Sequence, residues 1–329
     1  MLPARLLFAS LLLAVVANPL AAAAWATKQG DSTDLPGKHV TVTADGKVVA
    51  RLIYGSGQQM PYLAVYDEQE RLVTNPGLDK AGNEVGHEPH HRGLFLGWQK
   101  VQSDLGVANM WSMREGTRMQ VVEIEKVSTT KTGAMIVARI EWRAGKMDAQ
   151  GSDLLLTETR SLTVSRPAPN GTTQVDLSTR FKAARDLKLD GDVQHAGVHV
   201  RVADLVSKEP AKNSYLWSPD VPGVPGKVIS TQLQWGEFIF PLHGSWYSFA
   251  QLNAPRNPVE EFSTREYGRF GYFFKRDLKR NDTLALNYRF LLKSIPTPAS
   301  APKRSAAELA AARRDIDAAY AGFRRESKK

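Results

Sequence analysis

Cysteine is absent from the 329 residues of this chain. The fold therefore has no disulfide bonds, and a metal site with thiolate ligands is excluded. Beyond its N-terminal region the chain also lacks any apolar run of the ~20 residues that a membrane-spanning helix needs. Hydrophobic residues make up 42% of the chain, an ordinary share that is sufficient for a large core.

Motifs of several common enzyme classes are missing as well. There is no G-x-S-x-G nucleophile elbow, P-loop, H-E-x-x-H zinc motif or dinucleotide fingerprint, which disfavours serine nucleophiles and nucleotide chemistry. Carboxylates near the candidate site residues are few, namely Glu88, Asp192 and Glu266. A glycosidase mechanism with two carboxylates therefore has no clear spacing to support it.

The N-terminus has the layout of a secretory signal peptide. Arg5 precedes an apolar run from Leu6 to Ala17, and small residues follow, with an A-x-A site at Ala24 to Ala26. A membrane anchor is the alternative, but this run is shorter than the ~20 residues that span a bilayer. We predict that residues 1–26 are a signal peptide, that the mature chain begins near Thr27, and that the protein is periplasmic or secreted.

The chain is basic, with a net charge of +9, but much of the surplus lies in its tail. Residues 303–329 contain eight Lys or Arg against four Asp or Glu. This concentration in a short tail, together with the predicted export, disfavours a nucleic-acid partner and favours a solvated basic tail.

Residues 27–295 have the pattern of β-strands joined by turns. His39 to Tyr54 is rich in β-branched residues on both sides of Asp45-Gly46, a dipeptide that favours a tight hairpin. Turn clusters separate the other strand-like runs. Those runs are Tyr62 to Tyr66, Met119 to Val127, Ala134 to Arg143, Leu154 to Val164, Thr173 to Phe181, Val193 to Ala203, Trp246 to Leu252, Arg269 to Phe274 and Leu284 to Leu292. The pattern predicts an all-β fold, a large antiparallel β-sandwich.

Residues 296–329 are expected to form a Pro-rich linker and a basic C-terminal α-helix. Ser305 and Glu308 have the spacing of a capping box. Apolar residues then recur at helical spacing, at Leu309, Ala312, Ile316, Ala319 and Phe323. We expect this stripe to pack on the sandwich; docking to a membrane or a partner is the alternative.

The segment from Gly86 to Gly93 contains His87, His90, His91 and Arg92. Imidazole titrates near neutral pH, so these histidines are candidates for general acid or base catalysis or for metal binding. Adjacent residues of an extended chain point to opposite faces, so His90 and His91 would enter one site only if the loop turns.

Gln194 to Arg201 reads QHAGVHVR. In a strand His195, His199 and Arg201 would share one face with Gly197, opposite an apolar face. The glycine would leave room for a ligand against the backbone. The two histidines would lie about 13 Å apart at ~3.3 Å per residue, a spacing that suits a long substrate better than one metal ion.

Arg265, Tyr267 and Arg269 would likewise share one face if the chain is extended there. Arginine pairs with carboxylates, which fits an acidic sugar, and tyrosine can transfer protons. Alternatively, these arginines only hold a neighbouring loop.

Tryptophan often forms the floor of a sugar site. Trp98 and Trp111 are the two candidates for substrate contact because they follow the histidine loop closely; most of the other tryptophans are expected in the core.

These segments resemble an uncharacterised bacterial family labelled methane oxygenase PmoA. The matching stretches are PYLAVYD, HEPHHRGLFLGW, QHAGVHVR, REYGRFGYFF and LALNYRFLL, which run from Pro61 to Leu292. The resemblance implies an exported β-sandwich protein with a carbohydrate-related role. Family members more often have an aspartate before HPHHRG, where this chain has Glu88 as the candidate replacement.

Three hypotheses remain open from the sequence. The first is a carbohydrate-active lyase, hydrolase or epimerase that uses histidines and Tyr267 for proton transfer, with Arg92, Arg201, Arg265 and Arg269 binding the sugar. The second is a copper or zinc protein with histidine ligands. The third is a carbohydrate-binding protein without activity. No motif specifies a cofactor.

Overall fold

The computed structural model describes residues 23–31, 34–55, 58–166, 171–231, 233–258, 260–298 and 304–327. The predicted signal sequence, apart from its last residues, lies outside these ranges, as does part of the Pro-rich linker. The first strand begins at Trp25, two residues before the predicted mature N-terminus at Thr27. Among the described residues, no helix is long and apolar enough to cross a membrane.

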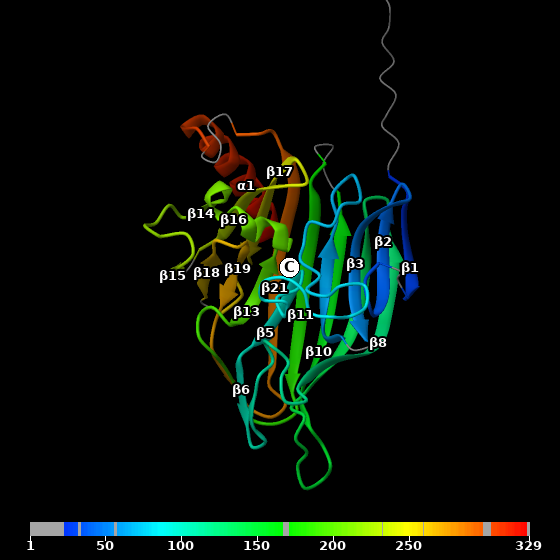
Figure 1. Ribbon diagram of the computed structural model, residues 1–329. Coiled ribbons are helices and arrows are strands. Elements are labelled where there is room, and N and C mark those ends of the chain that lie inside the picture. The colour runs from blue at the N-terminus through cyan, green and yellow to red at the C-terminus, as the bar shows by residue number, and fades with distance from the viewer. Residues whose placement is uncertain are drawn as a thin grey trace, which may run out of the picture.

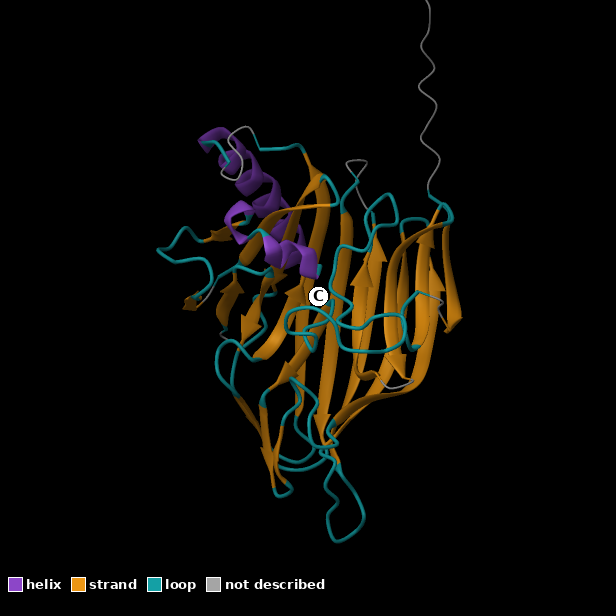
Figure 2. Cartoon of the chain, in the orientation of Figure 1, coloured by secondary structure: helices purple, strands orange, loops and turns teal. Residues whose placement is uncertain are grey.

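The fold is an antiparallel β-sandwich, which confirms the predicted class (Figures 1 and 2). The first large sheet has nine strands in the order β1 (Trp25–Asp31), β2 (Lys38–Ala44), β3 (Lys47–Gly55), β4 (Gln58–Val65), β5 (Leu94–Trp98), β13 (Ala196–Arg201), β19 (Arg269–Phe273), β18 (Glu261–Arg265) and β15 (Val228–Thr231). The second has eight strands in the order β14 (Ser214–Ser218), β16 (Trp235–Leu242), β17 (Ser245–Asn253), β21 (Thr283–Ile295), β11 (Thr173–Ala183), β10 (Leu154–Ser165), β9 (Gly133–Arg143) and β8 (Arg118–Thr129).

A third, smaller sheet extends from one end of the sandwich. It contains β20 (Arg276–Leu278), β12 (Leu187–Asp190), β6 (Lys100–Ser103) and β7 (Gly106–Ala108). Two short 3₁₀ helices, η1 (Asp204–Lys208) and η2 (Pro210–Lys212), follow β13.

The predicted hairpin is confirmed. β2 pairs with β3 in antiparallel register, and Asp45 and Gly46 have φ angles of 52° and 77°. Positive φ at both central residues is what a tight hairpin turn requires.

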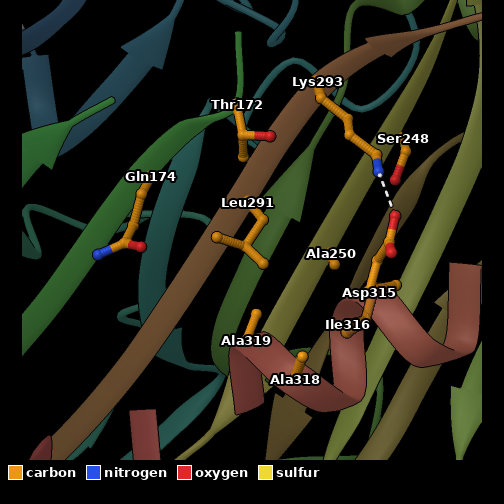
Figure 3. Close-up of a pocket in the computed structure, with 10 residues that line it drawn as sticks. All are labelled: Thr172, Gln174, Ser248, Ala250, Leu291, Lys293, Asp315, Ile316, Ala318 and Ala319. Carbon is orange, nitrogen blue, oxygen red and sulfur yellow. Dashed lines mark hydrogen bonds and ion pairs between the residues drawn. The ribbon is translucent and has the colours of Figure 1, made fainter. Parts of the chain in front are cut away.

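The helix α1 (Ala306–Glu326) covers the outer face of the eight-stranded sheet, beside β14, β16 and β17 (Figure 1). Ser305 and Glu308 form the predicted capping box. Ile316 and Phe323 are buried against the sheet, which confirms the predicted packing of the stripe. A cavity of ≈ 330 Å³ remains between helix and sheet, where Lys293 and Asp315 pair at 3.4 Å (Figure 3).

A buried ion pair lies between the two large sheets. Glu158 and Arg160 of β10 are bonded at 2.6 Å, and the Arg160 guanidinium also donates to the Pro61 carbonyl of β4 in the opposite sheet. Glu158 accepts further bonds from the Trp142 indole and the Thr179 hydroxyl. With no cysteine in the chain, this network is one of the polar links between the two sheets; another is the bond from the Gln251 amide to the Val198 carbonyl.

Candidate functional site

The candidate residues lie where β5, β13, β19 and β18 run side by side. Strand pairing places Arg201 of β13 opposite Arg269 of β19, and Arg269 opposite Arg265 of β18. His199 is aligned with Phe95 of β5. Directly paired residues in a sheet point to the same face, so the alternation predicted for QHAGVHVR holds from Ala196 to Arg201.

This polar face is covered, which corrects the expectation of an open stripe for a long ligand. His199, Arg201 and Arg269 are all 0% exposed. Loop residues lie over them: the His87 carbonyl accepts a bond from Arg201, and Trp111 lies edge-on to His199, with ring centroids 5.0 Å apart. The three side chains form the floor of the site, and other residues form its surface.

Gly197, which lies between His195 and His199, does not leave room for a ligand as predicted; it is required for close packing of two strands. Gly197 has a φ of +95°, and a Cβ there would lie 1.8 Å from the Tyr272 carbonyl oxygen. Similarly, a Cβ at Gly271 would lie 2.6 Å from the His199 ring. These glycines allow β13 and the His199 imidazole to lie close against β19; they do not leave space for a ligand.

His199 is a positioning residue, which corrects its predicted catalytic role. Its Nε2 lies 2.7 Å from the Ala196 carbonyl and its Nδ1 lies 3.0 Å from an Arg269 guanidinium nitrogen. The carbonyl only accepts and the guanidinium only donates, so the proton must be on Nε2. Burial, and then the Arg269 charge, lower the pKa of His199 well below 6.5. The neutral imidazole therefore holds Arg269 in place.

His91 is a neutral hydrogen-bond donor. The Trp111 indole donates to its Nε2 at 2.9 Å, and an indole cannot accept, so the proton is on Nδ1. That Nδ1 is buried and has no hydrogen-bond partner within the described residues. Burial, followed by the charge of His90 and then Arg269, holds the pKa of His91 well below its usual value. A buried donor without a partner is unfavourable and is suited to a ligand oxygen.

His195 has the geometry of a general base. It lies just before β13, in a turn where its backbone N–H donates to the Asp192 carbonyl, so it does not follow the strand alternation predicted for it. Its Nδ1 lies 2.7 Å from an Asp192 carboxylate oxygen, which leaves Nε2 without a hydrogen bond among the described residues. The side chain is 35% exposed. A carboxylate on Nδ1 fixes the tautomer and leaves the Nε2 lone pair free to accept a proton.

The histidine loop turns, so both of its adjacent histidines enter the site. Glu88 has a positive φ of 54°, and the His91 backbone N–H donates to the Glu88 carbonyl. The rings of His90 and His91 lie 4.1 Å apart. Burial is the main cause of a lowered pKa of His90.

Tyr267 and His87 complete the surface of the site. Their rings meet edge to face at 4.9 Å, and the Tyr267 ring lies parallel to His91 at 6.4 Å. The Arg201 guanidinium lies 4.8 Å from the Tyr267 ring centroid, a cation–π contact. His87 is exposed and Tyr267 is half-buried, so both are accessible from solvent.

The two buried arginines differ in how their charge is balanced. Arg201 pairs with Asp204 at 2.9 Å. Arg269 donates to His199 and to the Ser263 hydroxyl, but no carboxylate within the described residues forms an ion pair with it. Burial raises the pKa of Asp192, but the Gln194 N–H and His195 lower it, so that the net shift is downward. The charge of Arg269 makes a smaller contribution in the same downward direction.

Three predicted ligand contacts lie elsewhere. Trp98 is in the core, where its indole donates to the Phe274 carbonyl and packs against Trp142, so its predicted substrate contact is wrong. Arg92 bonds the Pro89 carbonyl and lines a ≈ 30 Å³ cavity beside Trp111, large enough for about one water. Arg265 donates to the Gly226 carbonyl, which supports the alternative that it holds a neighbouring loop.

Trp111, the other tryptophan that was predicted to contact the substrate, is buried within the site. It contacts three imidazoles, and its indole N–H is used by His91. The indole therefore determines that His91 accepts at Nε2, and the buried ring presents no face to a sugar.

Three residues that support the site were not found from the sequence. Asp204 binds Arg201 and the His87 N–H, Asn75 donates to the His91 carbonyl, and Ser263 accepts from Arg269. The position of Asp204, three residues after Arg201, was a signal that could have indicated its ion pair. Asn75 and Ser263 come from distant segments without such a signal.

The metal hypothesis has one cluster to support it. Glu88, His90 and His91 each offer a ligand atom, and these atoms lie within 4.8 Å of one another. The Trp111 bond has the wrong polarity, however, because a ligating histidine normally donates its second N–H, whereas His91 accepts. The Nδ1 of His91 would have to lose its proton to bind a cation, so the donor set fits a metal poorly.

Comparison with known proteins places the chain in a family. The profile of the family described as "Family of unknown function (DUF6807)" matches residues 39–306. The chain belongs to this family. The resemblance to methane oxygenase PmoA is therefore wrong as an identification, because nothing in the match indicates that enzyme. No curated protein matches the chain.

Solved structures similar to this DUF6807 member are distant. They include a mutant of the heparan sulfate lyase HepC from Pedobacter heparinus (10% identity, TM-score 0.37, 82% of this chain and 37% of that chain). A galactose mutarotase-like protein from Lactobacillus casei ATCC 334 matches at 8% identity and a TM-score of 0.38, over 82% of this chain and 100% of that chain. A galactose mutarotase related enzyme from Lactobacillus acidophilus matches at 7% identity and a TM-score of 0.36, over 84% of this chain and 99% of that chain. The chain thus spans little more than a third of the lyase, and similarity at this level carries no information on activity.

The buried histidines predict how the stability of this DUF6807 member depends on pH. The folded-state pKa values of His91 and His199 lie well below the ordinary 6.5. As the pH falls below about 6.5, the unfolded chain takes up protons that the folded chain does not, so stability decreases. We expect the melting temperature to fall as the pH is lowered from about 6.5 to 5, in scans by differential scanning calorimetry.

One buried carboxyl group acts in the opposite direction. Burial raises the pKa of Glu260 to about 8 from 4.5, with the Tyr288 hydroxyl opposing. Between pH 4.5 and about 8 the folded chain holds a proton on Glu260 that the unfolded chain has lost. The contribution of this group to the stability of the protein therefore decreases as the pH rises. The Glu260→Gln variant should show a steeper rise of melting temperature with pH between about 5 and 7. A slope unchanged by this variant would contradict the assignment of the neutral carboxyl.

Proposed function

We propose that this protein is an exported enzyme that acts on a sugar bearing a carboxylate, by proton transfer at His195. The observation that carries the proposal is the buried Arg269 guanidinium, which forms no ion pair within the described residues and whose charge helps to lower the pKa of Asp192, the partner of His195. The export part of the proposal rests on the apolar run from Leu6 to Ala17.

An unpaired buried cation is costly, and proteins normally pair it with a carboxylate. Burial lowers the pKa of Arg269, because the charged form of the guanidinium is less stable away from water. An anionic ligand above it would offset the cost, as would negative charge that develops during a reaction. The positive charge of Arg201 is already compensated by Asp204, so the positive charge that remains for an anionic ligand is that of Arg269.

The reaction that fits these groups starts with the removal of a proton from the carbon next to the sugar carboxylate. His195 takes this proton at Nε2, and the electron pair moves into the carboxylate as an enediolate, stabilised by the Arg269 charge and the His91 Nδ1–H. The electron pair then expels the oxygen on the neighbouring carbon, which takes a proton from the Tyr267 hydroxyl. The products are an unsaturated sugar acid and an alcohol.

This elimination is favoured over hydrolysis. A hydrolase of the common type needs two free carboxylates at the bond. Asp192 is bonded to His195, and Glu88 lies 3.6 Å from the His90 Nδ1. Epimerisation shares the first step and differs in that a proton is returned to the same carbon from the opposite face of the sugar ring.

The test is a panel of oligosaccharides that contain uronic acids, with neutral oligosaccharides of equal length as controls. Elimination is followed by the ultraviolet absorbance of the new double bond, and epimerisation by deuterium uptake from D₂O in NMR spectra. Reaction with acidic substrates alone supports the proposal. Binding without either signal would mean that the protein is a carbohydrate-binding module and would contradict an enzymatic role.

Arg269→Gln separates a ligand-binding role from a structural one. The amide can still donate to His199, and the unpaired charge is removed, so we expect an unchanged or higher melting temperature. Turnover of the acidic sugar should fall by about 10²- to 10³-fold. A strong loss of thermal stability would instead show that Arg269 serves the fold, and this proposal would lose its main support.

A further inference from the structure

An open groove lies on the far side of Asp204 from the candidate site. Its volume is ≈ 560 Å³, within the range of small-molecule sites. Most of its lining surface is apolar and comes from residues that include Leu72, Pro76 and Leu205. The polar residues that line it are Arg71, Thr74, Asn75, Asp204, Lys208 and His243.

Asp204 is the wall that this groove shares with the site. Its Oδ1 accepts from the His87 backbone N–H and from Arg201, each at 2.9 Å. Gly86 also lines the groove, and a Cβ there would lie 2.8 Å from Asp204 Cγ, so the histidine loop is pressed directly onto this wall. The groove and the candidate site therefore lie on opposite sides of Asp204, to which the His87 backbone N–H is bonded.

The accessible rings of the site come close to the groove, because His87 follows Gly86 in the chain and Gly86 lines the groove. His90 and Tyr267 are half-buried and His87 is exposed. The ring of Tyr267 touches that of His87 at 4.9 Å. A chain of sugar units bound at His195 would follow these rings to the groove.

The polar groups of the groove are suited to a sugar. His243 lies 3.2 Å from the Leu72 carbonyl through Nε2, so Nε2 donates and Nδ1 can accept from a hydroxyl. Lys208 is exposed and forms no ion pair within the described part of the chain. Arg71 is bonded to Asp67 and to the His243 carbonyl, which fixes the turn that carries His243.

We infer that this groove is a second subsite, which binds a further unit of an acidic oligosaccharide with Lys208 facing its anionic group. The inference rests on the proposed function and extends it: the substrate is an oligomer or polymer whose units occupy both positions.

The test compares Lys208→Glu and Leu205→Asp with wild type on acidic oligosaccharides of increasing length. Both side chains are exposed, so folding should be unaffected. Controls are Lys212→Glu, on an exposed lysine outside the groove, and Met147→Asp, on an exposed methionine elsewhere. We expect about a tenfold loss of kcat/KM with long chains, no change with disaccharides, and no effect of the control substitutions.

Calorimetric binding of a long uronate oligosaccharide gives a readout that needs no turnover. Weaker binding by Lys208→Glu but not by Lys212→Glu supports the subsite, even if the wild-type protein converts nothing. Equal losses at all chain lengths, or none, overturn the subsite and leave the proposed function intact. Absence of both binding and turnover by wild type overturns both.

Discussion

His195→Gln is expected to lower turnover of an acidic sugar by about 10²- to 10⁴-fold, the usual contribution of a positioned general base. The variant loses the Nε2 lone pair, which is the acceptor of the proton, while the amide can still bond Asp192. Because the side chain is 35% exposed and lies in a turn before β13, the melting temperature should stay within a degree or so of wild type.

A purely structural role for His195 would give a different result. Added imidazole should restore part of the activity of a His195→Gly variant, because a free base can occupy the vacated space. Asp192→Asn should reduce kcat with little change in KM, since Asp192 orients the imidazole without contacting the substrate. Full activity of His195→Gln, or absence of any imidazole rescue, would remove His195 as the base.

Glu158→Ala is expected to give the largest loss of stability, about 3–5 kcal/mol. Glu158 is fully buried, and its removal leaves the Arg160 cation unpaired in the core together with two donors, the Trp142 indole and the Thr179 hydroxyl. For a chain of this size the melting temperature should fall by on the order of 10 °C, measured by calorimetry.

The neighbouring strands offer a matched control. Glu123 of β8 pairs with Arg139 of β9 at 2.7 Å, but both side chains are exposed. Glu123→Ala should therefore change stability by less than about 1 kcal/mol. The double variant Glu158→Met, Arg160→Met should recover part of the loss, because it removes the unpaired charge. Equal effects at the two glutamates would refute the importance of burial.

The sequence predicted the fold well where the pattern is local. The hairpin at Asp45-Gly46 and the capping box at Ser305 are short-range signals, and both are as expected. The long strands β8 to β11 were also found. β5 was missed because its LFLGW run follows the histidine loop without a break, and β16 because both of its faces are buried, which removes the alternation.

The site was predicted as a set of segments but not as an arrangement. Strand alternation correctly grouped His199 and Arg201. It could not show that loops would bury them, because burial depends on contacts between segments far apart in sequence, such as Trp111 on His199. The roles of the histidines were likewise decided by partners that no local pattern identifies: a carbonyl, a guanidinium, an indole and a carboxylate.

The contacts of Trp111 with His91 and of Arg269 with His199 share one property. In both, the donor is a group that does not lose its proton in water at any physiological pH. The tautomers of these two imidazoles are thus fixed by chemistry that does not titrate. As long as the two imidazoles stay neutral, the interior of the site keeps the same pattern of donors and acceptors, and the groups that set this pattern do not change their own charge with pH.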